Sequence, residues 1–93
     1  MKYTLNPDVV LVSVLDENML TEVDTAAGGL RSMRSVNESG AYFWKLLEDG
    51  LDTDEIEARA SADFSIPAKL AESVLTEYLQ SLQSAGYLKL LSD

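Results

Sequence analysis

The chain contains neither cysteine nor histidine. Without cysteine it has no disulfide framework and no thiolate metal site. Without histidine it lacks the usual general base of enzymes and the commonest metal ligand. It also has no glycine-rich phosphate loop. We therefore expect no enzymatic activity, no catalytic residues, no metal site and no cofactor.

Cationic side chains are scarce. Seven lysines and arginines stand against sixteen acidic residues, which gives a formal net charge of −9. Nucleic-acid binding depends on cationic side chains that displace counterions from phosphates, so this charge argues against a nucleic-acid partner. The acidic groups at 16–17, 48–49 and 52–55 fall at predicted turns and helix starts. Acidic side chains there cap helices and remain solvated, which favours a structural role over a catalytic carboxylate pair.

Long apolar runs are also missing. No stretch approaches the roughly 20 apolar residues of a membrane helix, and the first residues have no apolar signal core. We expect no membrane partner and a cytoplasmic location. With 93 residues, 46% hydrophobic and 25% charged, the chain is predicted to form a single domain over residues 1–93.

The first part of the chain predicts a small sheet. Residues 1–8 are expected to be an irregular lead-in, with a turn at 16–18 and a loop at 24–29. The apolar residues Leu30, Met33 and Val36 are three apart, which does not fit strict strand alternation, so we expect a β-bulge there or a bend near Ser35. Runs rich in β-branched or apolar residues predict three strands, over Val9–Leu15, Met19–Val23 and Leu30–Val36.

The second part predicts three helices. Asn37 is a good N-cap for a helix over Glu38–Glu48, and Gly50 suits the left-handed position beyond it. A second helix is capped by Asp52 or Thr53 and ends near Asp63. A third begins around Pro67, which suits a first helical position, and ends before Gly86. Residues 87–91 read as a short terminal strand or an extended tail.

Strands followed by helices predict an α+β fold, with a winged-helix-like arrangement of a three-stranded antiparallel sheet followed by a three-helix bundle. Adjacent aromatic residues on a helix point in different directions and cannot form one flat stacking platform. We therefore expect Phe43 and Trp44 in the core, Tyr42 partly exposed, and Phe64 closed over the core.

The apolar surface of the third helix is wider than one core contact requires. Five apolar residues already fill a stripe of roughly 100°, and Leu70 and Val74 lie on its shoulder. One interpretation is a wide core face. The other is a groove for a second chain, because a helix shoulder beside an exposed strand is the setting for β-augmentation, in which an extended peptide joins the sheet edge.

The order and spacing of these motifs resemble the PqqD family over nearly the whole chain. The resemblance is carried by Asn6-Pro7-Asp8-Val9-Val10, Val36-Asn37-Glu38-Ser39-Gly40-Ala41, Phe43-Trp44, Leu46-Leu47, Gly50, Thr53-Asp54-Glu55-Ile56, Leu75, Tyr78-Leu79, Leu82 and Gly86-Tyr87-Leu88. The third strand departs from the family pattern, since Met33 and Arg34 stand where paired aromatics are common. The loop at 24–30 is also longer, so the register of the third strand is left open.

This resemblance implies a peptide-recognition domain for ribosomally synthesised, modified natural products. Such a domain binds the leader part of a precursor peptide as an added strand and presents it to a modifying enzyme, often a radical S-adenosylmethionine protein. The pathway would be that of pyrroloquinoline quinone or of another such product. The peptide-binding residues carried over are Leu30, Arg31, Ser32, Met33, Arg34, Ser35 and Val36 on the strand, with Lys69, Leu70, Ser73, Val74 and Glu77 on the helix.

Two alternatives stay open. An edge strand and an apolar helix shoulder equally suit a structural or assembly subunit that binds no peptide, for example as a homodimer. A winged-helix DNA-binding protein would share the topology, but its recognition helix would carry Lys69 as its only cation, against Glu72 and Glu77.

Overall fold

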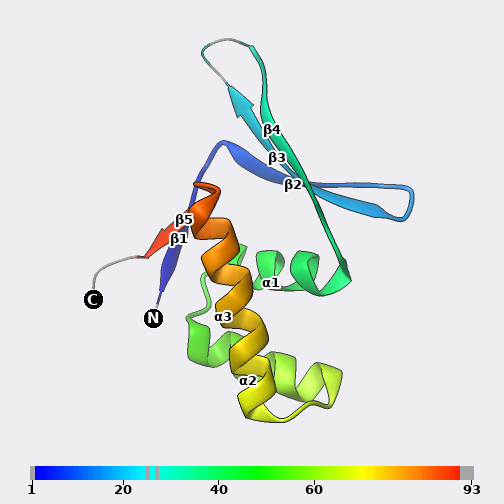
Figure 1. Ribbon diagram of the computed structural model, residues 1–93, viewed down its shortest axis with the longest axis vertical. Coiled ribbons are helices and arrows are strands. Elements are labelled where there is room, and N and C mark those ends of the chain that lie inside the picture. Colours follow the sequence, from blue (N-terminus) through cyan, green and yellow to red (C-terminus); the bar gives the residue numbers. More distant parts are fainter. Residues whose placement is uncertain (1, 25, 27, 91–93) are drawn as a thin grey trace.

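The computed structural model describes residues 2–24, 26 and 28–90. Figure 1 shows a hairpin-rich part and a helical part joined where β4 runs into α1. The predicted α+β order of three antiparallel strands followed by three helices is confirmed, and a strand is added at each end. The elements are β1 (Tyr3–Leu5), β2 (Val9–Val14), β3 (Glu17–Asp24), β4 (Gly29–Val36), α1 (Glu38–Glu48), α2 (Thr53–Phe64), α3 (Ala68–Ser84) and β5 (Leu88–Leu90).

The main sheet has the strand order β2-β3-β4 with antiparallel pairing throughout. Of the two expected irregularities, a β-bulge or a bend near Ser35, the bulge is present. The register passes from Glu22 opposite Ser32 to Val23 opposite Leu30, which leaves Arg31 as the extra residue of β4. Because of this extra residue, Leu30 and Met33 lie on the same face of the sheet although they are three apart.

The two faces of this sheet are both rich in apolar residues. The inner face carries the buried Val9 and Leu20. The register places the following residues together on the opposite side, which we call the outer face: Val10, Val12, Val14, Met19, Val23, Leu30 and Met33. Val10, Val14, Leu30 and Met33 are exposed there, whereas the solvent face of an antiparallel sheet is ordinarily polar.

The turn between β2 and β3 differs from the prediction. It contains two residues, Leu15 and Asp16, and β3 begins at Glu17, so Leu15 is not part of a strand and residues 17–18 are not part of the turn. Leu15 has a φ of 56° and is 97% exposed. Two-residue hairpin turns need positive φ values that glycine and asparagine adopt most easily. A leucine in this position is therefore both strained and exposed.

The predicted irregular lead-in is wrong for Tyr3–Leu5, which forms β1 and pairs antiparallel with β5. Tyr3 lies opposite Leu90 and Leu5 opposite Leu88. The sequence signal was weak because each strand has only three residues and gains its hydrogen bonds from the far end of the chain. The strand alternative for the tail is thereby confirmed. The predicted segments also included Met1, Thr25, Ala27 and Leu91, which lie outside the described residues.

The helices begin and end close to their predicted residues. The Asn37 side chain accepts a 2.8 Å hydrogen bond from the amide of Gly40 at the start of α1. Asp52 caps α2 and forms a capping box with Glu55, in which each side chain accepts from the other residue's amide. Pro67 is the N-cap of α3 and not its first helical residue.

The core lies where α1, α2 and α3 meet the inner face of the sheet. Trp44, Leu20, Ile56, Leu75 and Leu82 are its largest fully buried side chains. Phe43 and Trp44 are buried and Tyr42 is half-buried, as expected. The predicted position of Phe64 is wrong. It is 45% exposed and stands edge-on to the Tyr42 ring, with 4.9 Å between the ring centroids.

Candidate functional site

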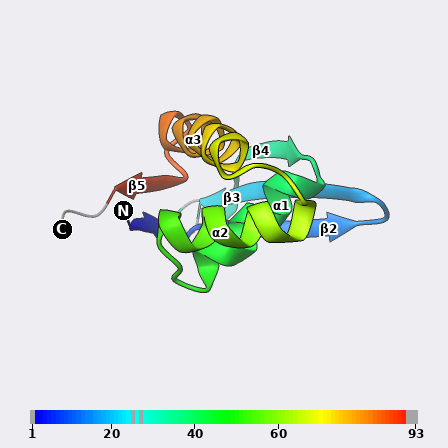
Figure 2. The same cartoon turned by 90° about the horizontal axis from the view of Figure 1, so that it is seen from below.

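The site begins with the free edge of β4. This strand is the last of the three in its sheet, and no described strand pairs with its other edge. The view in Figure 2 places α3 and β4 on the same side of the molecule, above β3 and β2. Backbone donors and acceptors at a free edge can pair with an added strand. The arrangement therefore offers an open sheet edge with a helix alongside.

A hollow of about 190 Å³ lies between β4, α3 and the start of α1. Its apolar lining comes from Val36 at the end of β4 and from Tyr78 and Leu82 on α3. The complete lining is Arg34, Ser35, Val36, Asn37, Gly40, Tyr78, Ser81 and Leu82. A hollow of this size can accept one or two side chains from a neighbouring chain.

Two hydrogen bonds connect the elements around this hollow. The Tyr78 hydroxyl donates to the carbonyl oxygen of Gly40 at 2.7 Å, which ties α3 to the first turn of α1. The Arg34 Nη1 donates to the carbonyl oxygen of Ser81 at 3.3 Å and so joins β4 to α3. Burial raises the pKa of the Tyr78 phenol well above its ordinary range, and the nearby positive charge of Arg34 opposes part of that shift.

The middle of β4 is held by a polar network at Ser32. The Ser32 hydroxyl lies 2.7 Å from the Tyr87 hydroxyl and donates to a Glu22 carboxylate oxygen at 3.2 Å. The Asn6 amide donates to the second oxygen of the same carboxylate at 3.1 Å. Because Tyr87 lies three residues beyond the last residue of α3, Ser84, this network connects β4 to the segment that follows the helix. The strand edge is thus held in place before any partner arrives.

An exposed face of α3 continues from the hollow towards the start of the helix. Leu70, Val74, Glu77 and Ser81 are spaced by four, three and four residues, which places them on one face of the helix. Leu70 is 48% exposed and Val74 is 38% exposed. These two apolar side chains are therefore not part of the core, and the interpretation as a wide core face is wrong.

The strand residues predicted for the site have different surroundings. Arg34, Ser35 and Val36 line the hollow, whereas Ser32 is bound into the polar network. Arg31 is the bulge residue, and its guanidinium forms a 3.4 Å ion pair with Asp24. The remaining two, Leu30 and Met33, belong to the outer face and are exposed beside the free edge.

The helix residues predicted for the site are all exposed: Lys69, Leu70, Ser73, Val74 and Glu77. They occupy the first part of α3, while the helix wall of the hollow is formed by Tyr78, Ser81 and Leu82. From the sequence, Tyr78 and Leu82 were assigned to the core stripe, and Ser81 was placed beside the shoulder but not among the peptide-binding residues. The four-three-four spacing from Leu70 would have added Ser81 to them.

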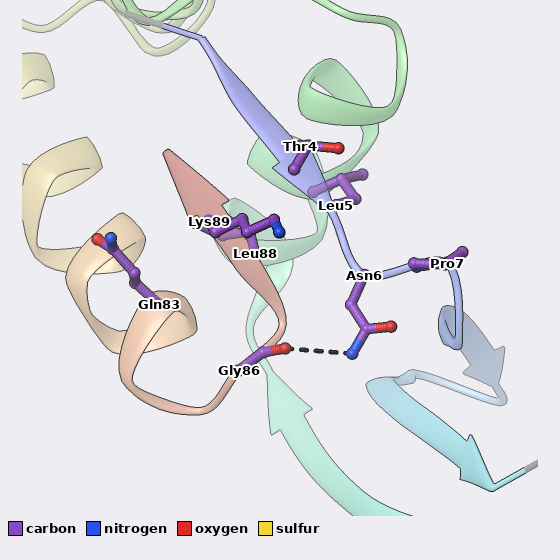
Figure 3. Close-up of a pocket in the computed structure, with 8 residues that line it drawn as sticks. All are labelled: Thr4, Leu5, Asn6, Pro7, Gln83, Gly86, Leu88 and Lys89. Atoms are coloured by element: carbon purple, nitrogen blue, oxygen red, sulfur yellow. Dashed lines mark hydrogen bonds between the residues drawn. The ribbon is translucent and has the colours of Figure 1, made fainter. Parts of the chain in front are cut away.

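A larger hollow of about 520 Å³ lies beside the paired strands β1 and β5. Figure 3 shows its lining, with Asn6 and Gly86 joined by a hydrogen bond of 3.2 Å from the Asn6 amide to the Gly86 carbonyl. The Asn6 backbone amide also donates to the Tyr87 carbonyl. These polar groups hold the end of α3 to the first strands, which is a structural role.

Within residues 2–24, 26 and 28–90, no group of three acidic, histidine or cysteine side chains could hold a metal ion. In that same part of the chain, no helix is long and apolar enough to cross a membrane.

Comparison with known proteins supplies independent evidence. The family model described as Coenzyme PQQ synthesis protein D (PqqD) matches residues 9–88. The structure of TbiB1 in complex with the TbiA(beta) leader peptide is similar over 100% of both chains, with 26% identity and a TM-score of 0.76. No curated protein matches the sequence.

A second similar structure is that of lasso peptide synthetase B1 complexed with the leader peptide. The match covers 97% of this chain and 100% of the other, with 17% identity and a TM-score of 0.77. At that identity the likeness shows a shared fold.

Proposed function

Because the chain belongs to the PqqD family, we propose that it is a non-catalytic recognition domain that binds the leader segment of a ribosomally synthesised precursor peptide. The leader would add as a fourth strand to the free edge of β4, with α3 as the opposite wall. The observation that carries this proposal is the open edge of β4 beside an apolar helix stripe and a hollow. Backbone hydrogen bonds would supply affinity and side-chain pockets would supply specificity.

The proposed peptide-binding residues are those carried over from the sequence, at 30–36 on β4 and at 69, 70, 73, 74 and 77 on α3. To these we add Tyr78, Ser81 and Leu82, which line the hollow. The known binding of a leader peptide by TbiB1 supports this assignment, since that protein is similar to the whole of this chain.

The second part of the proposal is that the bound precursor is presented to a modifying enzyme, such as a radical S-adenosylmethionine protein. The pathway would be pyrroloquinoline quinone synthesis or that of another ribosomally made product. We place the domain in the cytoplasm, where precursor peptides are made. The family description, which names coenzyme PQQ synthesis, supports a role in such a pathway.

The experiment is a titration of isotope-labelled protein with the leader peptide of the precursor encoded beside its gene. We expect chemical-shift changes in the amides of Leu30–Val36 and Lys69–Leu82. The core helix α2 serves as an internal reference because it contributes no residue to the hollow. Changes spread evenly over the chain, or none in β4 and α3, would contradict the proposal.

A second candidate function is an assembly subunit that pairs with another copy of itself. The observation that favours it is the outer face, where Val10, Val14 and Met33 are exposed on a sheet without a cover among the described residues. Exposed apolar side chains gathered on one face of a sheet can mark an interaction site. Sedimentation velocity over a concentration series would test it, with Val14→Lys expected to abolish any dimer. A monomer at all concentrations excludes this candidate.

DNA binding is disfavoured by the charges of α3. Lys69 is its only cation, and Glu72 and Glu77 share its exposed surface. Phosphate contacts require several cationic side chains. An electrophoretic mobility shift of duplex DNA that weakens with added salt would support DNA binding.

A further inference from the structure

We infer that Arg34 selects leader peptides that carry an acidic residue, and that it reaches this residue by leaving the carbonyl of Ser81. The inference rests on the proposed function, because it concerns the chemistry of the peptide that adds to β4. Four features of the described residues support it: the long, exposed hydrogen bond from Arg34 to Ser81, the lack of a carboxylate partner for Arg34, the face of the sheet on which Arg34 lies, and the apolar hollow next to it.

The contact that now holds Arg34 is easily exchanged. The guanidinium and the Ser81 carbonyl are joined at 3.3 Å in exposed surroundings. The same carbonyl also accepts a 3.2 Å hydrogen bond from the amide of Ala85 at the end of α3. When Arg34 leaves, the carbonyl keeps this second donor and is not left unsatisfied. Displacement therefore removes one contact without creating a buried polar group.

Arg34 has no carboxylate within ion-pair distance among the described residues, although the chain carries sixteen acidic side chains. Its neighbour on the same strand, Arg31, is paired with Asp24. A charge-assisted hydrogen bond to a carboxylate is stronger than one to a neutral carbonyl, and a guanidinium can make two such bonds at once. A carboxylate on an added strand would therefore be preferred to Ser81.

The register fixes the side on which this carboxylate would lie. Arg34 is opposite Leu20, whose side chain is fully buried, so both belong to the inner face, and from this face Arg34 reaches Ser81 of α3. An added strand would place alternate side chains on this face. A residue beside Arg34 and a residue two positions along the peptide, beside Val36, would both point towards α3.

The second of these positions meets the apolar part of the hollow, formed by Val36, Tyr78 and Leu82. The peptide that fits best thus has an acidic residue and an apolar residue separated by one position. The acidic residue would pair with Arg34 across the strands, and the apolar residue would fill the hollow. This is a more specific requirement than strand addition alone.

Selection from a random peptide library displayed on phage would test the inference on the full chain. We expect the selected peptides to share an Asp or Glu two positions from an apolar residue. Their affinity should fall about fivefold with Arg34→Gln, the range of a cross-strand charge pair. The matched control is Arg59→Gln, because Arg59 is an exposed arginine of α2 and does not line the hollow. This substitution should leave the affinity unchanged.

A charge exchange completes the test. Replacing the acidic residue of a selected peptide by Lys should abolish binding to the wild type and restore it with Arg34→Glu. Thermal denaturation of each variant verifies folding, which the exposed position of Arg34 should preserve. Peptides that shift the β4 amides but show no acidic preference, or that bind Arg34→Gln equally well, overturn the inference alone. If no selected peptide shifts the β4 amides, the proposed function fails and the inference fails with it.

Discussion

The Tyr78 hydroxyl donates a 2.7 Å hydrogen bond to the carbonyl oxygen of Gly40. This bond joins the middle of α3 to the first turn of α1, and both residues line the hollow beside β4. The same two residues are in close packing contact, since a Cβ added to Gly40 would lie 3.2 Å from a carbon of the Tyr78 ring. The position of α3 relative to the sheet edge is thus set by a small number of local contacts.

Replacing Tyr78 by phenylalanine should remove the hydrogen bond while keeping the ring. We expect the free energy of unfolding to fall by about 1 kcal/mol, the usual contribution of such a bond. Urea denaturation would measure it. Tyr42→Phe is the matched control, because its hydroxyl bonds to Asp63 in exposed surroundings, and its effect should be smaller. Equal effects of the two variants would contradict this role of Tyr78.

Gly40→Ala should destabilise the protein although alanine is the better helix former. The added Cβ would lie 3.1 Å from Val36 Cβ and 3.2 Å from the Asn37 cap oxygen, as well as against Tyr78. Crowding of this kind costs about 1–3 kcal/mol, which exceeds the gain of about 1 kcal/mol in helix propensity. A lower melting temperature is expected. A variant as stable as the wild type would show that these three neighbours can move together.

Val74→Asp should weaken leader-peptide binding and leave the fold intact. Val74 is exposed on the α3 stripe, so the substitution buries no charge in the free protein, whereas a bound peptide would cover it. We expect the affinity to fall by about tenfold, in line with the loss of about 1.5 kcal/mol of apolar contact. Calorimetric titration would measure it, and Leu70→Asp should behave alike. Ala58→Asp, on the exposed side of α2, is the control and should bind normally.

Trp44→Ala should unfold the domain under ordinary conditions. Trp44 is 1% exposed and is among the largest buried side chains. Removing such a residue costs about 3–5 kcal/mol, a large part of the stability of a small protein. Loss of the cooperative thermal transition in circular dichroism is the expected result. An unchanged transition would mean that α1 does not hold the core together.

Stability should decline in alkali partly through Tyr42. Its partial burial, and then its hydrogen bond to Asp63, raise the pKa of this phenol from 10.0 to about 12. Below the unfolded-state pKa both states hold the proton and the group has no effect on the pH dependence. As the pH rises from 10.0 towards about 12, the unfolded state ionises first and stability is lost. Tyr42→Phe should flatten this part of the denaturation profile, and an unaltered slope would contradict the assignment.

The sequence predicted best those features that depend on neighbouring residues. The bounds of α1 were predicted correctly because the Asn37 cap and the residues that end the helix are adjacent to it in the sequence. From the spacing of Leu30, Met33 and Val36 we expected a bulge or a bend near Ser35. Val36 lies on the other face of the sheet from Leu30 and Met33, but the bulge is present in β4. Its place at Arg31 could not be predicted, because that depends on which residue of β3 lies opposite.

Features that join distant parts of the chain were missed. The pairing of β1 with β5 connects residues more than eighty positions apart, and three-residue strands leave almost no pattern. The hollow was missed for a similar reason. Tyr78 contacts both the core and the hollow, whereas the helical periodicity of the sequence assigns it to the core alone. Phe64 was expected to close over the core, but α2 ends at this residue and the ring packs on Tyr42 at the surface.

The pairing of β1 with β5 also bears on how this domain can be combined with others. Tyr3 and Leu90 lie directly opposite each other, and opposed residues of antiparallel strands have Cα atoms about 4.5–5.5 Å apart. Residues 3–90 could therefore be inserted into a single surface loop of a host protein, because the two ends of the insert would lie close enough to join neighbouring residues of that loop. A short linker across the same gap, with new ends opened at Leu15 and Asp16, would give a circularly permuted chain with the edge of β4 undisturbed.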